Sequence, residues 1–133
     1  MKYILHADDD HSDRWDFKYL VNTIDPTINV LGFSNGLELM QYLSGISDQL
    51  LPFMIFLDLR MPIWDGIKTL QTIKNEPRFM AIPVYIWSIA DTKREMELCI
   101  KMGAEQFLTK PTTGEEHTRS RIMISGMINK TLI

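Results

Sequence analysis

The sequence predicts an α/β fold, namely a doubly wound open parallel sheet built from five successive strand–helix units, (βα)5. Five short apolar runs, each followed by a segment with helical spacing, are residues 3–7, 28–33, 53–57, 83–87 and 106–109. The third and fourth runs lack an alternation of apolar and polar residues, which is typical of parallel strands covered on both faces. Strands of this kind need helices on both sides, reached through right-handed crossovers.

Apolar residues recur at helical intervals between these predicted strands. A helix with such spacing buries one face and leaves the other in solvent, so these segments should pack on the sheet. The residues that carry the spacing after the first and third strands are Phe17, Leu20, Val21 and Ile24, and Ile67, Leu70 and Ile73.

Polar and glycine residues mark the ends of the later helices. Thr92 stands three residues before Glu95, and Thr113 stands three residues before Glu116. At this spacing the two side chains can cap the first free amides of a helix reciprocally. We therefore expect the fourth and fifth helices to begin after these threonines, and the fourth to end at Gly103.

The composition narrows the class of protein. The chain has 133 residues and a net charge of −3, from 14 Lys and Arg against 17 Asp and Glu. This length fits a single domain over residues 1–133, with a core over 3–130 and no output domain after it. The acidic balance disfavours nucleic acid as a partner, and no apolar run is long enough for a membrane. With Cys99 as the single cysteine and no signal-peptide pattern, we expect a cytoplasmic protein.

Polar residues follow four of the predicted strands. They are Asp8-Asp9-Asp10, Asp58, Ser88 and Lys110-Pro111. In open parallel sheets the functional site lies beyond the carboxyl ends of the strands, so these residues should meet there. Carboxylates that crowd together repel one another unless a cation is present, and oxygen ligands suit Mg²⁺. A carboxylate, a hydroxyl, an ammonium and a metal ion are the groups that phosphoryl transfer requires.

Four segments together resemble the receiver domain of bacterial two-component response regulators. They are residues 4–10, residues 57–62 with the following Asp65-Gly66, residues 82–88 and residues 103–111. The resemblance covers nearly the whole chain, from Tyr3 to the last helix. It implies a flavodoxin-like sheet with strand order 2-1-3-4-5 and a single-domain response regulator that acts in a phosphorelay.

The resemblance assigns a role to each carboxylate. It implies that Asp58 accepts a phosphoryl group from a sensor histidine kinase or a histidine phosphotransfer protein, with Mg²⁺ as the cofactor. The alternative for Asp58 is a turn or helix-capping aspartate. Asp9 and Asp8 would bind the metal together with Asp58, and Arg60 would offer its backbone carbonyl. Asp10 fits the start of the first helix, where a negative charge is favourable.

The resemblance also implies a switch. Lys110 would contact Asp58 and later a phosphoryl oxygen, and a cis peptide bond between Lys110 and Pro111 would position the lysine. Ser88 would donate a hydrogen bond to the phosphoryl group, and Phe107 would then rotate inward. The change would reach the surface made by the fourth helix, the fifth strand and the fifth helix. The alternatives are a solvent-facing lysine and an aromatic ring that only fills the core.

Two residues near the expected site depart from the family pattern. Ile89 stands where a small residue is usual, and we hypothesise that it acts with Arg60 to restrict the water that attacks the acyl phosphate. His6 replaces an aliphatic residue in the first strand. We expect it to be partly buried and hydrogen-bonded to a neighbour, since Mg²⁺ prefers oxygen ligands.

The last helix carries more apolar residues than one buried stripe needs. It can therefore serve as a homodimer or partner contact, although burial against the sheet with a frayed end explains the pattern equally well. The residues are Ile122, Met123, Ile124, Met127 and Ile128.

Three functions fit these features. The favoured one is a receiver that is not a general enzyme but catalyses phosphorylation and dephosphorylation of its own Asp58. The second is an adaptor with the same fold that is never phosphorylated. The third is a phosphatase of the haloacid dehalogenase kind, which needs a second aspartate two residues after its nucleophile. Arg60 occupies that position, so this reading is disfavoured.

Overall fold

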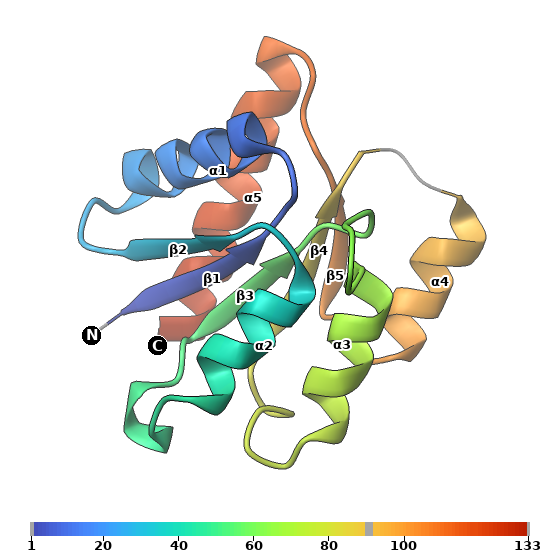
Figure 1. Ribbon diagram of the computed structural model, residues 1–133. Helices are drawn as coiled ribbons and strands as arrows, with labels where there is room; N and C mark the ends of the chain where they lie inside the picture. The colour runs from blue at the N-terminus through green and yellow to red at the C-terminus, as the bar shows by residue number, and fades with distance from the viewer. Residues whose placement is uncertain (1, 90–91, 133) are drawn as a thin grey trace.

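Strands and helices alternate along the chain in the computed structural model, which describes residues 2–89 and 92–132 (Figure 1). The strands are β1 (Tyr3–Ala7), β2 (Asn29–Phe33), β3 (Met54–Leu57), β4 (Val84–Ser88) and β5 (Gln106–Thr109). The helices are α1 (His11–Ile24), α2 (Gly36–Ser44), the short 3₁₀ helix η1 (Asp48–Leu50), α3 (Gly66–Asn75), α4 (Lys93–Lys101) and α5 (Gly114–Leu132). The bounds of all five predicted strands agree with those observed to within one residue.

The strands form one parallel sheet in the order β2-β1-β3-β4-β5, which confirms the expected order 2-1-3-4-5. At the carboxyl ends of β1 and β3, Ala7 pairs with Leu57. The residues that follow these two strands are Asp8 and Asp58, so the register alone brings the two carboxylates to adjacent positions at one edge of the sheet.

The carboxyl ends of β4 and β5 meet in the same way. Ser88 pairs with Thr109, and the amide of Lys110 donates a hydrogen bond of 2.7 Å to the Ser88 carbonyl oxygen. Because parallel strands share one carboxyl edge, Lys110 and Ser88 lie at the same edge as the two aspartates.

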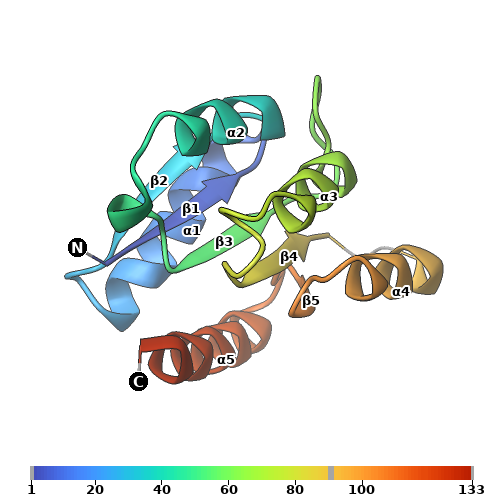
Figure 2. The ribbon, with the colours of Figure 1, turned by 90° about the horizontal axis from the view of Figure 1, so that it is seen from below.

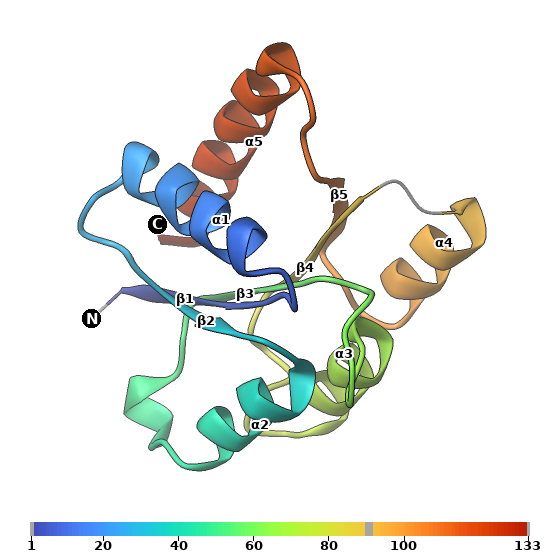
Figure 3. The same ribbon diagram turned by 45° about the horizontal axis from the view of Figure 1, so that its top comes forward.

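The sheet separates two layers of helices (Figures 2 and 3). Helices α1 and α5 cover one face, where Phe17 and Ile124 belong to one apolar cluster. Helices α2, α3 and α4 supply residues such as Leu70 and Cys99 to the cluster on the other face. None of the described helices is both long and apolar enough to cross a membrane.

The helix ends agree with the predicted capping residues. The hydroxyl oxygens of Thr92 and Thr113 accept hydrogen bonds from the amides of Glu95 and Glu116, at 3.2 and 3.1 Å. Gly103 follows the end of α4 with φ of 110°, a backbone conformation that favours glycine.

Candidate functional site

Three carboxylates gather at the carboxyl edge of the sheet. One side-chain oxygen from each of Asp8, Asp9 and Asp58 lies within 4.8 Å of the other two. Asp8 and Asp58 are buried, whereas Asp9 is exposed at the start of the loop into α1. The cluster is therefore closed toward the core and reached from solvent on the side of Asp9.

Lys110 completes the cluster from the end of β5. Its ammonium donates hydrogen bonds to one oxygen each of Asp8 at 2.7 Å, Asp13 at 2.8 Å and Asp58 at 3.1 Å. Only 10% of its side chain is exposed. Burial by itself lowers the pKa of Lys110, but the hydrogen bonds to Asp13 and Asp8 outweigh it and raise the pKa above the ordinary lysine value. The ammonium is charged at every physiological pH.

The carboxylate of Asp58 is held at both oxygens. The Ser88 hydroxyl donates to Oδ1 at 2.8 Å, and the backbone amide of Arg60 lies 3.4 Å from the same oxygen. Oδ2 accepts from Lys110. These contacts fix the orientation of the carboxylate before any ligand arrives, which is how a protein prepares a group for reaction.

Asp8 is tied to the backbone around it. Its Oδ1 accepts a hydrogen bond from the amide of Asp10 at 3.0 Å, and its carbonyl oxygen accepts one from Arg14 at 2.7 Å. Burial raises the pKa of Asp8 above its ordinary value, and the hydrogen bond from Lys110 opposes that rise. A bound cation would stabilise the charged form of this buried carboxylate.

The donor atoms of the cluster fit a hard divalent cation. All three are carboxylate oxygens, two of them lie in a buried setting, and Lys110 offsets only part of their charge. Oxygen ligands of this type suit Mg²⁺ and Mn²⁺ better than softer metals. The proposed contribution of the Arg60 backbone carbonyl stays a prediction.

The loop between β3 and α3 is held close to Asp58. A Cβ atom at Gly66 would clash with the carbonyl oxygen of Asp58, so only glycine allows α3 to begin there. Asp65 caps this helix by accepting from the amide of Lys68 at 2.8 Å. Within the loop Ile63 has φ of 68°, a left-handed conformation that is unfavourable for a β-branched residue.

The peptide bond between Lys110 and Pro111 is trans, so the expectation of a cis bond is wrong for this structure. The trans isomer is the more stable one before proline in general. The lysine ammonium reaches Asp8 and Asp58 with this isomer, so the position of the ammonium does not require the cis form.

The expectation for His6 is also wrong. Its side chain is fully buried, and neither ring nitrogen has a hydrogen-bond partner in the described structure. The ring packs against Phe17 at a centroid distance of 4.3 Å, and its Nε2 lies 3.8 Å from Asp8, too far for a hydrogen bond. Burial, followed by the charges of Lys110 and Arg14, lowers the pKa of His6 to about 3, so the ring is neutral.

The expected switch residues lie on neighbouring strands, Ser88 at the end of β4 and Phe107 in β5. Ser88 is fully buried against Asp58, while Phe107 is half-buried and packs on the cluster that contains Cys99. Phe107 also lines a hollow of about 550 Å³ with Met96 and Ile100 of α4. The hollow therefore lies between the Phe107 ring and α4.

Two functional candidates were not predicted from the sequence. Asp13 binds Lys110 from the first turn of α1, and Glu95 of α4 pairs with the side chain of Arg60 at 2.7 Å. Asp13 stands one helical turn after Asp10, which could have signalled that it faces the acidic cluster. No spacing in the sequence relates Glu95 to Arg60, because they are 35 residues apart.

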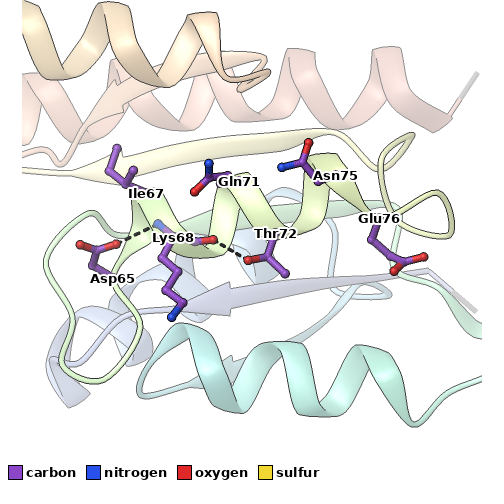
Figure 4. A pocket seen from close by; sticks show the side chains of 7 residues that line it. All are labelled: Asp65, Ile67, Lys68, Gln71, Thr72, Asn75 and Glu76. Carbon is purple, nitrogen blue, oxygen red and sulfur yellow. Dashed lines mark hydrogen bonds between the residues drawn. The ribbon is translucent and has the colours of Figure 1, made fainter.

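A second hollow, of about 750 Å³, lies along α3 and not over the carboxylates (Figure 4). Several of its polar groups bond to their own helix: Asp65 accepts from the Lys68 amide, and the Thr72 hydroxyl donates to the Lys68 carbonyl oxygen. The acidic cluster is thus the candidate site, and this hollow is a polar helix surface.

The sheet topology and the chemistry of the acidic cluster indicate what kind of protein this is. An open parallel sheet that presents three carboxylates, a hydroxyl and a lysine at its carboxyl edge is built for phosphoryl chemistry. The chain belongs to the response regulator receiver domain family, whose sequence pattern matches residues 4–122. Members of this family are signalling domains, and aspartate phosphorylation is characteristic of them.

Two relatives illustrate the match. The chain is 30% identical over 126 residues to the two-component response regulator ARR6 of Arabidopsis thaliana, covering 90% of this chain and 67% of the relative. It is 30% identical over 131 residues to the chemotaxis protein CheV2 of Helicobacter pylori, covering 98% of this chain and 39% of the relative. The chain thus spans only part of the curated relatives that it matches.

Solved structures show the same fold. The Mn²⁺-bound form of response regulator Rcp1 has a TM-score of 0.77 at 24% identity and covers 93% of this chain and 91% of its own. The phosphorylated cyanobacterial phytochrome response regulator RcpA has a TM-score of 0.83 at 22% identity and covers 98% and 94%. The likeness establishes the flavodoxin-like architecture.

Proposed function

We propose that the protein receives a phosphoryl group on Asp58 from a phosphohistidine of a sensor histidine kinase or a histidine phosphotransfer protein. One observation carries this proposal: the Asp58 carboxylate lies between the Ser88 hydroxyl and the Lys110 ammonium, beside two further carboxylates. An Asp58 oxygen attacks phosphorus, the phosphorus–nitrogen bond to the imidazole breaks, and the electron pair stays on the imidazole nitrogen. The product is an acyl phosphate and a histidine that takes up a proton.

The side chains around Asp58 supply the electrostatic part of this transfer. Lys110 is a buried positive charge within 3.1 Å of Asp58, placed to pair with a phosphoryl oxygen. The Ser88 hydroxyl can turn its proton from the carboxylate to the new phosphoryl group. Both groups already contact the Asp58 carboxylate, so neither has to be brought in from solvent for the reaction.

Asp8, Asp9 and Asp58 would hold a divalent cation, which we propose to be Mg²⁺. When bound, the ion offsets the negative charge of the carboxylates and of the phosphoryl oxygens. The Mn²⁺-bound form of Rcp1 supports a divalent cation in a domain of this fold. The backbone carbonyl of Arg60 is the further ligand that we propose.

The output surface would be the one formed by α4, β5 and α5. A turn of Ser88 toward the phosphoryl group would draw in the end of β4 and admit the ring of Phe107 into the space beside it. Exposed apolar side chains on this surface, including Met123 and Ile100, could then contact a partner or a second copy of the chain. Ile124 and Ile128 are buried against the sheet and cannot serve in this way.

Tryptophan fluorescence tests the proposal, because Trp87 is buried next to Ser88 and Trp64 lies in the loop after Asp58. Beryllofluoride with Mg²⁺, a stand-in for the phosphoryl group, should change the emission of the wild type and leave Asp58→Asn unchanged. An unresponsive wild type would contradict phosphorylation and favour an adaptor.

A further inference from the structure

We infer that Asp13 is a positioning residue that holds Lys110 back from a phosphoryl group on Asp58 and so weakens phosphoryl binding at this site. The inference rests on the proposed function of Asp58. Asp13 lies outside the four segments on which the family resemblance depends, and its contact with Lys110 joins the first turn of α1 to the end of β5.

The ammonium of Lys110 has no spare donor. An ammonium has three hydrogens, and the three carboxylates of Asp8, Asp13 and Asp58 accept at 2.7, 2.8 and 3.1 Å. The bond to Asp58 is the longest, so the lysine lies nearer to the other two. A phosphoryl oxygen can gain Lys110 only if one of these carboxylates gives it up.

Of the three carboxylates that bind Lys110, Asp13 alone lies outside the cluster that would hold a cation. Asp8 and Asp58 belong to the oxygen cluster that fits a cation, and Asp13 does not. A cation would therefore compensate Asp8 and Asp58 and leave Asp13 dependent on Lys110. Asp13 thus remains the competitor of the phosphoryl group for the lysine.

The surroundings of Asp13 allow it to act in this way. Its amide donates to Asp10 at 3.0 Å, which fixes it in the first turn of α1. Its side chain is 37% exposed, compared with 10% for Lys110. Water can therefore solvate the Asp13 carboxylate after the lysine leaves, so the release is reversible. The negative charge of Asp13 also repels an incoming phosphoryl group.

The test measures beryllofluoride binding to the Mg²⁺-loaded protein by tryptophan fluorescence, in wild type, Asp13→Asn, Asp13→Glu and Asp16→Asn. Asp16 lies on the same helix and carries the same charge, but it makes no bond to Lys110 in the described structure. Asp13→Asn should lower the half-saturating concentration about threefold to tenfold, as expected when a partly exposed charged hydrogen bond no longer competes. Asp13→Glu keeps the negative charge and should have the half-saturating concentration of the wild type.

A second readout needs no metal. In the presence of a chelator, the Nζ resonance of Lys110 in nitrogen-15 NMR should be sharp in wild type and Asp16→Asn and broadened by faster hydrogen exchange in Asp13→Asn. Unchanged beryllofluoride binding in Asp13→Asn, or equal tightening in Asp16→Asn, would overturn the inference while leaving the role of Asp58 intact. A wild type that binds no beryllofluoride would overturn the proposed function, and the inference with it.

Discussion

The guanidinium of Arg60 and the carboxylate of Glu95 form a two-pronged ion pair, at 2.7 and 3.0 Å, that joins the loop after Asp58 to the first turn of α4. Hydrogen bonds from Arg60 lower the pKa of Glu95 to about 2. Glu95 also takes part in the cap of α4, because its amide donates to Thr92. The pair therefore connects the loop after Asp58 directly to the proposed output surface.

Loss of this pair should loosen α4. In Arg60→Ala we expect faster hydrogen exchange of the α4 amides in the first turn and little change in global stability, since exposed ion pairs contribute little. Hydrogen exchange followed by mass spectrometry measures this. Arg119→Ala, which breaks the exposed pair with Glu115 in α5, is the control that should leave α4 unchanged. Identical α4 exchange in Arg60→Ala and wild type would contradict the connection.

Ile89 should protect the acyl phosphate. Ile89 directly follows Ser88, whose hydroxyl bonds to Asp58, and its side chain is 61% exposed and thus outside the core, so we expect it to cover the approach of water to Asp58. In Ile89→Ala we expect the phosphoryl group to be lost severalfold faster, measured as decay of phosphoprotein after the donor is removed. Ile122→Ala removes an equally exposed side chain, 66%, from α5 and should decay like wild type. Equal lifetimes in all three proteins would rule out the shielding role.

His6 should destabilise the protein in acid. Its pKa is about 3 in the fold and about 6.5 in an unfolded chain, so the unfolded state binds the extra proton as the pH falls through 6.5. The loss should reach about 2 kcal/mol at pH 5. His6→Leu removes this loss and also removes two unpartnered ring nitrogens, for a further gain of about 1–3 kcal/mol at pH 7.

Urea unfolding with a chelator present, at pH 7 and pH 5, measures the difference between His6→Leu and wild type. Other titrating groups are common to both proteins and largely cancel. The advantage of the variant should grow as the pH is lowered. An advantage that shrinks on acidification would show that the histidine is charged in the folded protein.

Ile63 should carry backbone strain. A left-handed conformation with φ of 68° is unfavourable by about 1–2 kcal/mol for a residue with a Cβ atom, and its side chain is 72% exposed. Ile63→Gly should therefore raise the unfolding free energy by about 0.5–1 kcal/mol, after the larger entropy of the unfolded glycine chain is subtracted. Ile122→Gly, in the interior of α5, should lower it by about 1 kcal/mol. A loss of stability in both variants would contradict the strain.

The gathering of Asp8, Asp58 and Lys110 could be predicted because each residue follows directly on a strand, whereas the strand order 2-1-3-4-5 was implied by the family resemblance. In a parallel sheet, position at the carboxyl end of a strand fixes the edge of the sheet at which a residue lies. The apolar runs alone thus predicted which residues lie at the carboxyl edge of the sheet.

The remaining features depend on side-chain rotamers and on the paths of loops. Ile4 and His6 share one face of β1, but the strand period does not reveal that His6 lacks a hydrogen-bond partner in the described structure. Lys110 reaches its partners without the expected cis bond because a long side chain adapts to the backbone. The Arg60–Glu95 pair depends on where α4 packs, which no local pattern encodes.

Locating the phosphoryl group on the chain tests whether Asp58 is the phosphoacceptor. The protein is incubated with Mg²⁺ and a small phosphodonor, the acyl phosphate is reduced with borohydride to convert the modified aspartate to homoserine, and the site is found by peptide mass spectrometry. Homoserine at position 58, absent in Asp58→Asn and in the absence of donor, is the predicted result. Modification at another residue, or none in the wild type, would contradict it.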